Sequence, residues 1–363
     1  MAEPLIFLGA GASKPFGIPT MKDFVEDFSK NLDATGTPEE KSLYHAVLED
    51  VQRRFGWIDL EAVFSVINTL SDGVVQSDFG YFSPFYYRRY LGCEPESTMN
   101  VSEKIETDKQ TAKSLRGELE SFVRRKCDIS EQYFGLIYSV YSSFFTSLAE
   151  ATGSRHTYHH NGKEFAYKMW SIFTTNYDLC IEEYCREYGL TLDTGVHYDE
   201  VRKQSVVGTE SFNSGPDRLS LAKLHGSLNW FKQDDGRIIE HYREVERTFG
   251  LHKTVGQVML YPIREKEMYL DPYLHMMYFL DRRLRLSRVW LVIGYRFNDE
   301  IIRGMFASHS NRKLMVIVHP NPKEIREKLS NFKCEFIMMP GHFGDPRTMQ
   351  EIAQKFSELG IRD

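Results

Sequence analysis

Four short segments of the chain carry polar side chains of types that can do chemistry. They read TTNYD at 174–178, HGSLNW at 225–230, GYRFND at 294–299 and HPN at 319–321. The amide of Asn176 can hold a hydroxyl group or a water molecule as donor and acceptor together. A neutral imidazole such as that of His225 can accept a proton near pH 7. Asn176 and His225 are therefore the candidate pair for orienting and activating an oxygen nucleophile.

These polar residues also have simpler explanations. Asn176 or Asp178 can cap the helix that follows, and Asp299 can do the same for a later helix. His225, placed before a glycine, can merely shape a turn. Each segment, however, directly follows an apolar run of the sequence. Four such segments in one chain favour a shared binding pocket over four unrelated turns.

A glycine-rich turn near the start of the chain adds a phosphate-binding pattern. The apolar run 5–8 leads into Gly9, Ala10, Gly11 and Ser13, and a helix is expected from about Thr20 as its N-cap. Such a turn brings a phosphate group to the end of a strand. Glycine is expected there because a Cβ would hold the backbone away from a pyrophosphate, and because the turn can require positive φ. The third glycine of the usual dinucleotide pattern is absent, since its position falls on Lys14.

Apolar runs that alternate with helical patterns predict the scaffold that positions these segments. The runs cover residues 5–8, 171–174, 220–224, 257–261, 289–293, 314–318 and 334–339. Continuous apolar strands between helices indicate a parallel sheet covered on both faces. We therefore predict an α/β, Rossmann-like, doubly wound parallel sheet. Ligands bind such sheets at the carboxyl ends of the strands, so the four polar segments should converge beside the glycine turn.

The region 34–168 breaks this rhythm and predicts a helical insertion. One helical stripe consists of Leu60, Val63, Phe64, Ile67 and Leu70. The aromatic segment 79–90, with two arginines, suits core packing or, alternatively, base stacking with nucleic acid. His156, His159 and His160 fall in an expected loop, where metal binding is the alternative to a plain polar loop. The predicted division is 1–33 with 169–345 as the nucleotide-binding domain, 34–168 as the insertion and 346–363 as a C-terminal helix.

Composition bounds the class of protein. The chain has 363 residues, 42% of them hydrophobic and 26% charged, which is typical of a soluble globular protein. No apolar run reaches transmembrane length, and the first residues do not form a signal peptide. The five cysteines form no C-x-x-C pair, which favours a reducing cytoplasm and argues against disulfides or a structural zinc site. The formal net charge of -6 provides no general attraction to nucleic acid, and direct binding through a local basic surface stays open.

Taken together, the motifs GAGASKPFGIPT, FTTNYD, KLHGSLNW and IGYRFND resemble the sirtuin-like family, in particular bacterial antiphage enzymes that hydrolyse NAD⁺. The resemblance runs from Leu5 to about Pro320. It implies that Asn176 and His225 are the catalytic pair and that the glycine turn cradles the pyrophosphate. The residues that it places at the nucleotide are Gly9, Ala10, Gly11, Ser13, Thr20, Asp178, Gly294, Tyr295 and Asn321.

Two departures from the sirtuin deacylases bear on activity. Those enzymes continue the first motif with Asp-Phe-Arg, where this chain has Thr20-Met21-Lys22, and they hold a zinc ion with two C-x-x-C pairs that this chain lacks. The resemblance then implies an NAD⁺ glycohydrolase that takes NAD as its substrate, uses no metal and serves antiphage defence by NAD depletion. It also implies a homo-oligomer in the cytoplasm, off the membrane, with a HerA-like ATPase as candidate partner. The alternatives are a catalytically idle module that binds NAD or ADP-ribose, and an NAD-dependent protein deacylase.

Overall fold

The computed structural model describes residues 4–71, 85, 89, 99–153, 156–160, 163–167, 170–201, 204–208, 212, 219–241, 248–249, 252–259 and 272–359. The chain divides into two compact units. The larger unit comprises Met1–Ile18, Cys127–Leu260 and Glu265–Asp363, and the smaller comprises Pro19–Lys126 with Tyr261–Arg264. The domain boundaries expected from the sequence stay a prediction. Each unit is described by itself.

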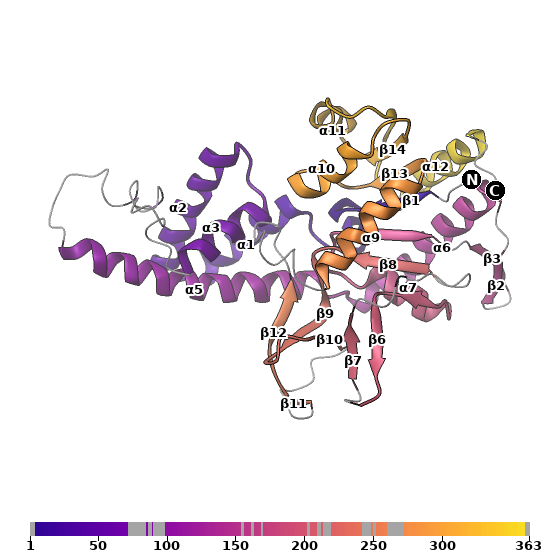
Figure 1. The fold of residues 1–363 in the computed structure, drawn as a ribbon. Helices are drawn as coiled ribbons and strands as arrows, with labels where there is room; N and C mark the ends of the chain where they lie inside the picture. The colour runs from indigo at the N-terminus through magenta and orange to yellow at the C-terminus, as the bar shows by residue number, and fades with distance from the viewer. Residues whose placement is uncertain are drawn as a thin grey trace. The chain divides into compact units, whose positions relative to one another are not determined.

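A seven-stranded parallel sheet organises the larger unit (Figure 1). Its strands are β1 (Leu5–Leu8), β4 (Ser171–Thr174), β5 (Leu192–Asp193), β8 (Leu219–Lys223), β13 (Val289–Ile293), β14 (Leu314–His319) and β15 (Glu335–Pro340). They lie in the order β15-β14-β13-β1-β4-β8-β5. From β1 the chain builds outward on one side through β4 and β8, and later on the other side through β13, β14 and β15. That reversal beside β1 is the topological switch of a Rossmann-like sheet, so the predicted fold class is confirmed.

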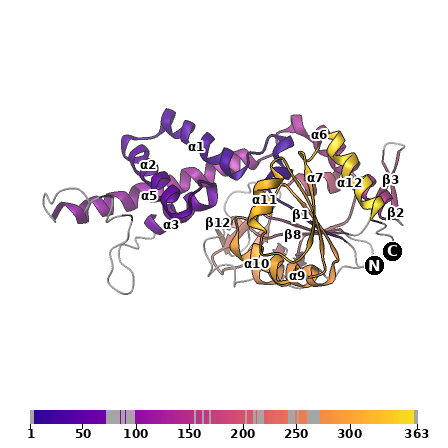
Figure 2. The same cartoon turned by 90° about the horizontal axis from the view of Figure 1, so that it is seen from above.

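Helices cover both faces of this sheet, as the buried apolar strands require (Figure 2). On one face lie α6 (Phe134–Ala151), α7 (Cys180–Glu187) and α12 (Pro346–Glu358), and on the other lie α9 (Tyr273–Leu286) and α10 (Glu300–Ser308). A short helix, α11 (Pro322–Lys328), follows β14. Alternate strand residues such as Phe7 and Trp290 pack with Phe306 of α10 in one hydrophobic core. The helices predicted to begin near Asp299 and Pro346 are confirmed as α10 and α12.

A second sheet of six strands also belongs to the larger unit. Its strands are β6 (Val196–Asp199), β7 (Gln204–Val207), β9 (Gly226–Gln233), β10 (Ile238–Glu240), β11 (Thr248–Phe249) and β12 (His252–Met259). The prediction that 257–261 forms a strand of the parallel sheet was wrong. Residues 257–259 end β12, which pairs antiparallel with β9. A short apolar run predicts a strand but not its partner, because the pairing is decided by distant residues.

A hairpin inside the region expected to be helical is a further correction. Strands β2 (His156–His160) and β3 (Lys163–Tyr167) pair antiparallel. The histidines at 156, 159 and 160 therefore lie on a strand rather than in the expected loop, and their side chains lie outside the described residues. Thr157 and Tyr158 are residue types that favour a strand, a signal that the surrounding helical patterns obscured.

The smaller unit is helical. Its elements are α1 (Met21–Thr35), α2 (Pro38–Phe55), α3 (Leu60–Ser71) and α5 (Met99–Cys127). Thr20 caps α1 as predicted, in a reciprocal capping box with Asp23, and Thr37 does the same for α2. The apolar stripe predicted on 60–70 is confirmed as the buried side of α3. Within the aromatic segment 79–90 the structure describes Phe85 and Arg89 alone, and the rest of that prediction lies outside the described residues.

Candidate functional site

The polar segments emerge from one row of the parallel sheet. Leu8 of β1 pairs in register with Ile293 of β13 and Thr174 of β4, and Thr174 pairs with Lys223 of β8. Asn176 and His225 thus both lie two residues beyond a paired position on neighbouring strands. Adjacent strands are about 4.8 Å apart, so the segments predicted to converge begin at the same edge of the sheet.

Asn176 is joined by hydrogen bonds to the glycine turn. Its Nδ2 donates to the carbonyl oxygen of Gly9 at 3.0 Å and to Oγ of Ser13 at 2.9 Å. The Ser13 hydroxyl in turn donates to Oδ2 of Asp178 at 2.6 Å. Asn176, Ser13 and Asp178 are all buried. The fold therefore assembles four of the predicted site residues into one hydrogen-bonded chain.

Asp178 makes two contacts, one with each carboxylate oxygen. The first of them is the helix cap that the sequence suggested. Its Oδ1 accepts a hydrogen bond from the backbone N–H of Cys180, at the start of α7, at 3.1 Å. Its Oδ2 accepts from Ser13. This carboxylate thus stabilises the start of α7 and orients the Ser13 hydroxyl, which accepts the hydrogen bond from the Asn176 amide.

Lys223 of β8 also holds the segment that follows β4. It was not identified as a site residue from the sequence. Its Nζ donates to the backbone carbonyls of Tyr177 and Asp178 and to Oε1 of Glu182, the last at 2.9 Å. The lysine is 1% exposed, so its charge is held inside the protein. Burial raises the pKa of Glu182, while the lysine opposes that shift. A lysine inside the apolar strand SLAKL was the available signal, because a buried charge needs a partner.

His225 lies at the end of β8, 1% exposed. Its Nε2 lies 3.2 Å from Oδ2 of Asp299. Oδ1 of that aspartate accepts hydrogen bonds from the backbone N–H groups of Ile301 and Ile302, at 2.9 and 3.0 Å, and so caps α10. The expectation that Asp299 caps a helix is confirmed, and its contact with the imidazole is an additional role.

The glycines of the first turn are required by backbone packing. A Cβ at Gly9 would lie 2.6 Å from the Cα of Tyr295, and a Cβ at Gly11 would lie 2.8 Å from the Cα of Gly294. The positive φ expected at these two glycines does not occur, because Gly9 has φ -105 and Gly11 is not among the residues with positive φ. Positive φ is found instead at Gly17 (φ 79) and at Gly294 (φ 65). The close approach of Gly294 and Tyr295, directly after β13, is therefore a second reason for glycine in the turn, and approach to a pyrophosphate stays a prediction.

The backbone of the turn forms short 3-10 turns, η1 (Ala10–Ala12) and η2 (Lys14–Phe16), rather than running directly into an α-helix. The N–H groups of Gly9, Gly11, Ala12 and Ser13 all donate to main-chain carbonyls. A phosphate cradle here would rest on the shape of the turn and on Ala10 more than on these four amides. The α-helix expected after the turn is α1, which lies within the smaller unit.

The remaining candidates are placed less centrally. Tyr295 is buried, with its ring 4.7 Å from that of Phe7 between centroids. Asn321 is exposed at the start of α11, and its backbone N–H donates to Nδ1 of His319 at 3.0 Å. Burial lowers the pKa of His319, which suits a neutral ring that accepts this bond. Thr20 caps α1 in the smaller unit.

Buried oxygen atoms near His225 and Asn176 identify where a polar ligand would be stabilised. Among the described residues, Oδ1 of Asn176, Oγ of Ser227 and Oδ1 of Asn229 are buried and have no hydrogen-bond partner. The backbone N–H of Leu228 donates to the carbonyl of Tyr177 at 3.1 Å, so the two segments are in contact. An unsatisfied buried acceptor costs about 1–3 kcal/mol, and such atoms are rare in native proteins. Hydroxyl groups of a ligand would satisfy them.

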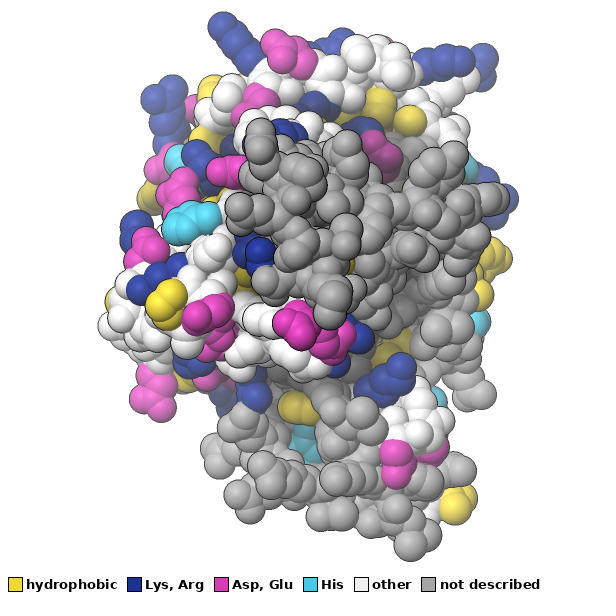
Figure 3. Space-filling view, turned by 90° about the vertical axis from the view of Figure 1, so that its left-hand side faces the viewer, with side chains coloured by type: hydrophobic (Ala, Val, Ile, Leu, Met, Phe, Trp, Pro, Cys, Tyr) yellow, Lys and Arg dark blue, Asp and Glu magenta, His cyan; other side chains and the backbone are white. Residues whose placement is uncertain are grey.

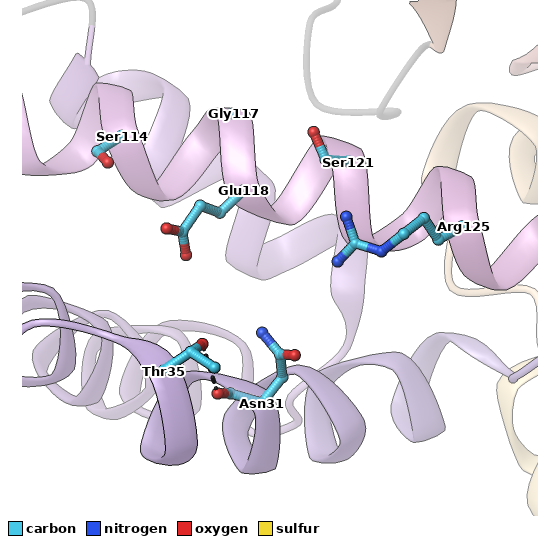
Figure 4. A pocket seen from close by; sticks show the side chains of 7 residues that line it. All are labelled: Asn31, Thr35, Ser114, Gly117, Glu118, Ser121 and Arg125. Atoms are coloured by element: carbon cyan, nitrogen blue, oxygen red, sulfur yellow. Dashed lines mark hydrogen bonds between the residues drawn. The ribbon is translucent and has the colours of Figure 1, made fainter.

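Two other surfaces formed by described residues carry charged side chains. In the smaller unit a pocket of about 600 Å³ is lined by Asn31, Thr35, Ser114, Gly117, Glu118, Ser121 and Arg125. Figure 4 shows Glu118 of α5 directed toward α1, and Arg125 extending along α5. On the face in Figure 3, acidic and basic side chains are interspersed among the described residues. Among the described residues, the pocket lining contains no histidine.

A cluster of metal-ligating side chains and a membrane-spanning helix are both absent among the described residues. No group of three His, Cys, Asp or Glu side chains is placed to hold a metal ion within the part of the chain that the structure describes. In that same part, no helix is both long and apolar enough to cross a membrane.

Comparison with known proteins finds one similar family model, over less than half of the chain, and several similar solved structures. Residues 171–337 match the family model described as the SIR2-like domain. One similar solved structure is a mutant of Sir2 homologues in complex with 2'-O-acetyl ADP ribose (TM-score 0.43, 13% identity, 99% of this chain and 94% of that chain). Another is a Sir2 homolog–NAD complex (TM-score 0.40, 13% identity, 98% of this chain and 89% of that chain). No curated protein matches.

Proposed function

We propose that this protein is an NAD⁺ glycohydrolase that cleaves NAD⁺ to nicotinamide and ADP-ribose, with NAD⁺ as substrate. The observation that carries the proposal is the placement of Asn176 and His225 two residues beyond paired positions on adjacent strands. Both stand at the carboxyl edge where doubly wound sheets bind nucleotides. The SIR2-like match over 171–337 includes both residues.

The chemistry of NAD⁺ cleavage suits groups of this kind. The positive charge of NAD⁺ lies on the nicotinamide, which departs as a neutral molecule, so no general acid is needed for the leaving group. Ordinary glycoside hydrolysis, by contrast, uses a pair of carboxylates. The remaining tasks are to orient the ribose, to stabilise an oxocarbenium-like state and to supply a positioned nucleophile.

The side chains divide these tasks. The Asn176 amide is held through Nδ2 by Gly9 and Ser13, which leaves Oδ1 to accept a hydrogen bond from a ribose hydroxyl or the attacking water. His225 accepts a proton from that oxygen. The buried oxygens of Ser227 and Asn229 add acceptors for further hydroxyls. A sugar, with several hydroxyl donors, is a ligand whose chemistry fits these groups.

The other nucleotide contacts follow from the fold. The turn 9–13 and the segment after Gly294 flank the switch point beside β1, where a pyrophosphate and adenosine would lie. Gly9, Ala10, Gly11 and Ser13 are assigned to the pyrophosphate, and Gly294, Tyr295 and Asn321 to the adenosine side. Asp178 orients Ser13 through the hydrogen bond that its Oδ2 accepts.

The biological role is proposed on the motif resemblance. An unrestrained NAD⁺ hydrolase would deplete its own cell, so activity has to await a trigger. Defence against phage by NAD depletion is consistent with that requirement. The cytoplasm, where NAD⁺ is abundant, is the proposed location. A homo-oligomer and a HerA-like ATPase are the proposed means of control.

The test is release of nicotinamide from NAD⁺ by the purified chain, alone and with the protein encoded beside it. We expect Asn176→Ala and His225→Ala to lower the rate by about 10²-fold or more while the protein stays folded. His309→Ala is the matched control, because His309 also pairs with an aspartate, Asp281, at 2.7 Å, on helices away from the sheet edge. Its rate should equal that of the unaltered protein.

Three results would overturn the proposal. Full NAD⁺ cleavage by both folded variants would exclude the assigned pair. Stoichiometric NAD⁺ binding without nicotinamide release, with or without the neighbouring protein, would select an idle binding module. Turnover that requires an acyl-lysine peptide would select a protein deacylase.

A further inference from the structure

We propose that Asp299 is a positioning residue that fixes the tautomer of His225, so that the imidazole accepts protons through Nδ1. This inference rests on the proposed function of His225 as a base. It adds a residue that the sequence suggested only as a helix cap. The argument depends on how the two oxygens of one carboxylate are used.

The helix holds the carboxylate in place. Oδ1 of Asp299 accepts two backbone N–H groups at the start of α10, at 2.9 and 3.0 Å. With that oxygen committed to the helix, Oδ2 faces Nε2 of His225 at 3.2 Å. Helix α10 packs into the core through Ile302 and Phe306, so the carboxylate belongs to a rigid element.

The chemistry of the two groups then decides the tautomer. A carboxylate offers only acceptors, so the hydrogen between Oδ2 and Nε2 belongs to the imidazole. A neutral imidazole with its hydrogen on Nε2 carries its lone pair on Nδ1. Nδ1 is therefore the atom that takes a proton from a substrate hydroxyl or water. The same logic gives the aspartate of a Ser-His-Asp triad its role.

Burial makes this contact effective. The side chains of His225 and Asp299 are 1% and 3% exposed. Little water competes for either group, and a hydrogen bond to a charged group is stronger in such surroundings. The ring orientation is thus set before any ligand arrives.

The substitution Asp299→Asn separates the positioning role from the capping role. Asparagine caps helices about as well as aspartate, through its carbonyl oxygen. If that oxygen keeps the contacts to Ile301 and Ile302, the amide NH₂ must face the imidazole. An NH₂ group donates, so Nε2 has to become the acceptor and the hydrogen has to move to Nδ1.

Asp345→Asn is the matched control. Asp345 caps α12 by accepting a hydrogen bond from the backbone N–H of Thr348 at 3.3 Å, and it also accepts one from the Thr348 hydroxyl at 2.9 Å. Asp345→Asn therefore replaces a capping carboxylate with an amide, as Asp299→Asn does. The capping contacts of Asp345 given above involve no histidine. Any effect of weakened capping alone should appear equally in both variants.

The experiment combines nitrogen NMR of histidine side chains, recorded without NAD⁺, with steady-state kinetics. The His225 signals are assigned by their loss in His225→Gln. We expect the unaltered protein and Asp345→Asn to carry the hydrogen on Nε2, and Asp299→Asn to carry it on Nδ1. We expect kcat of Asp299→Asn to fall by about 10²-fold with little change in KM, while both asparagine variants unfold at similar urea concentrations.

The outcomes distinguish this inference from the proposed function. If the unaltered protein releases nicotinamide and Asp299→Asn retains the Nε2–H tautomer or full kcat, the inference fails alone. If no protein releases nicotinamide but the tautomer changes as expected, the proposed function fails and the positioning contact stands. An equal loss of kcat in both asparagine variants would reduce Asp299 to a helix cap and also overturn the inference.

Discussion

The ends of β4 and β8 are neighbours in the sheet, yet they are built differently. After β4, the groups of Asn176 and Asp178 are held by Gly9, Ser13 and the buried charge of Lys223. After β8, Nε2 of His225 faces Oδ2 of Asp299, and buried oxygens of Ser227 and Asn229 lack partners among the described residues. The first end is held in place before binding, whereas the second retains hydrogen-bonding capacity.

That difference suggests how such a site works. A catalytic amide must be oriented before substrate arrives, because ordering it at each turnover would cost entropy. A proton acceptor and a hydroxyl-binding surface must instead keep lone pairs for the ligand. The comparison predicts that changes to the contacts that hold the end of β4, those of Lys223 included, act mainly on stability. Changes to the groups that follow β8 should act on titration and rate.

Lys223→Met should have the largest effect on stability. The change leaves the carboxyl of Glu182 and two carbonyls buried without their cation, and breaking a buried pair typically costs about 3–5 kcal/mol. Urea unfolding measures this loss. Adding Glu182→Met should recover part of it, because apolar replacement of a whole buried pair is often tolerated.

Lys313→Met is the matched control for this prediction. Lys313 also donates to two main-chain carbonyls, those of Arg285 and Ser287, each at 2.7 Å, but it lies near the surface. Its loss should cost no more than about 1 kcal/mol. Equal losses at both lysines would mean that the end of β4 gains nothing special from its buried charge.

Gly294→Ala should come next in size. The residue has φ 65, and a Cβ there would lie 2.6 Å from the backbone of Gly11 and Ala12. Strain and overpacking together should cost roughly 2–4 kcal/mol. Because the turn would shift, the contact between Gly9 and Asn176 should weaken and nicotinamide release should fall as well.

Gly304→Ala tests whether that effect is specific. Gly304 lies within α10, and a Cβ there would meet nothing within 4 Å. This change should leave activity unaltered and stabilise the protein by about 0.4–1 kcal/mol. Both alanine variants are measured by urea unfolding and by nicotinamide release. Gly294→Ala should lower the stability of the protein and Gly304→Ala should raise it. A similar change in both would contradict the packing argument.

The smallest effect concerns pH on the β8 side. Burial, followed by the nearby charge of Glu182, raises the pKa of Glu240 from 4.5 to about 7. The folded protein therefore keeps this proton to higher pH than the unfolded chain does. The resulting stabilisation is complete below pH 4.5 and is lost as pH rises through 7. Across that window the free energy of unfolding should fall by about 1–3 kcal/mol.

Glu240→Gln removes this titration and keeps an acceptor for Asn229, whose Nδ2 donates to Oε1 at 3.1 Å. Stability measured by urea unfolding from pH 5 to 8 should fall less steeply in this variant. Glu335→Gln, at the exposed start of β15, is the control and should follow the unaltered protein. Parallel curves for all three proteins would show that Glu240 does not titrate in this range.

The sheet could be predicted wherever local sequence contains the whole signal. The runs 289–293 and 314–318 are buried along their full or nearly full length, and continuous apolar residues are sufficient to indicate that environment. The run 257–261 failed because its partner, β9, is decided by tertiary pairing. For the same reason, the hairpin at 156–167 was hidden among helical patterns.

The candidate site shows the same limit at the level of side chains. Asn176 and His225 could be singled out because polar residues directly follow apolar strands. Lys223 and Asp299 could not be placed, because their partners Glu182 and His225 lie 41 and 74 residues away along the chain. A residue's own type does not say which distant group it will meet.

The order of residues alone determined the strands, their alternation with helices and the edge at which polar groups gather, because these depend on local periodicity and chain direction. Tertiary structure decided which carboxylate faces the imidazole, which charge lies beneath the amide and why the first turn requires glycines. Those features arise from close contacts between segments that are distant along the chain, since burial and hydrogen bonding act through space.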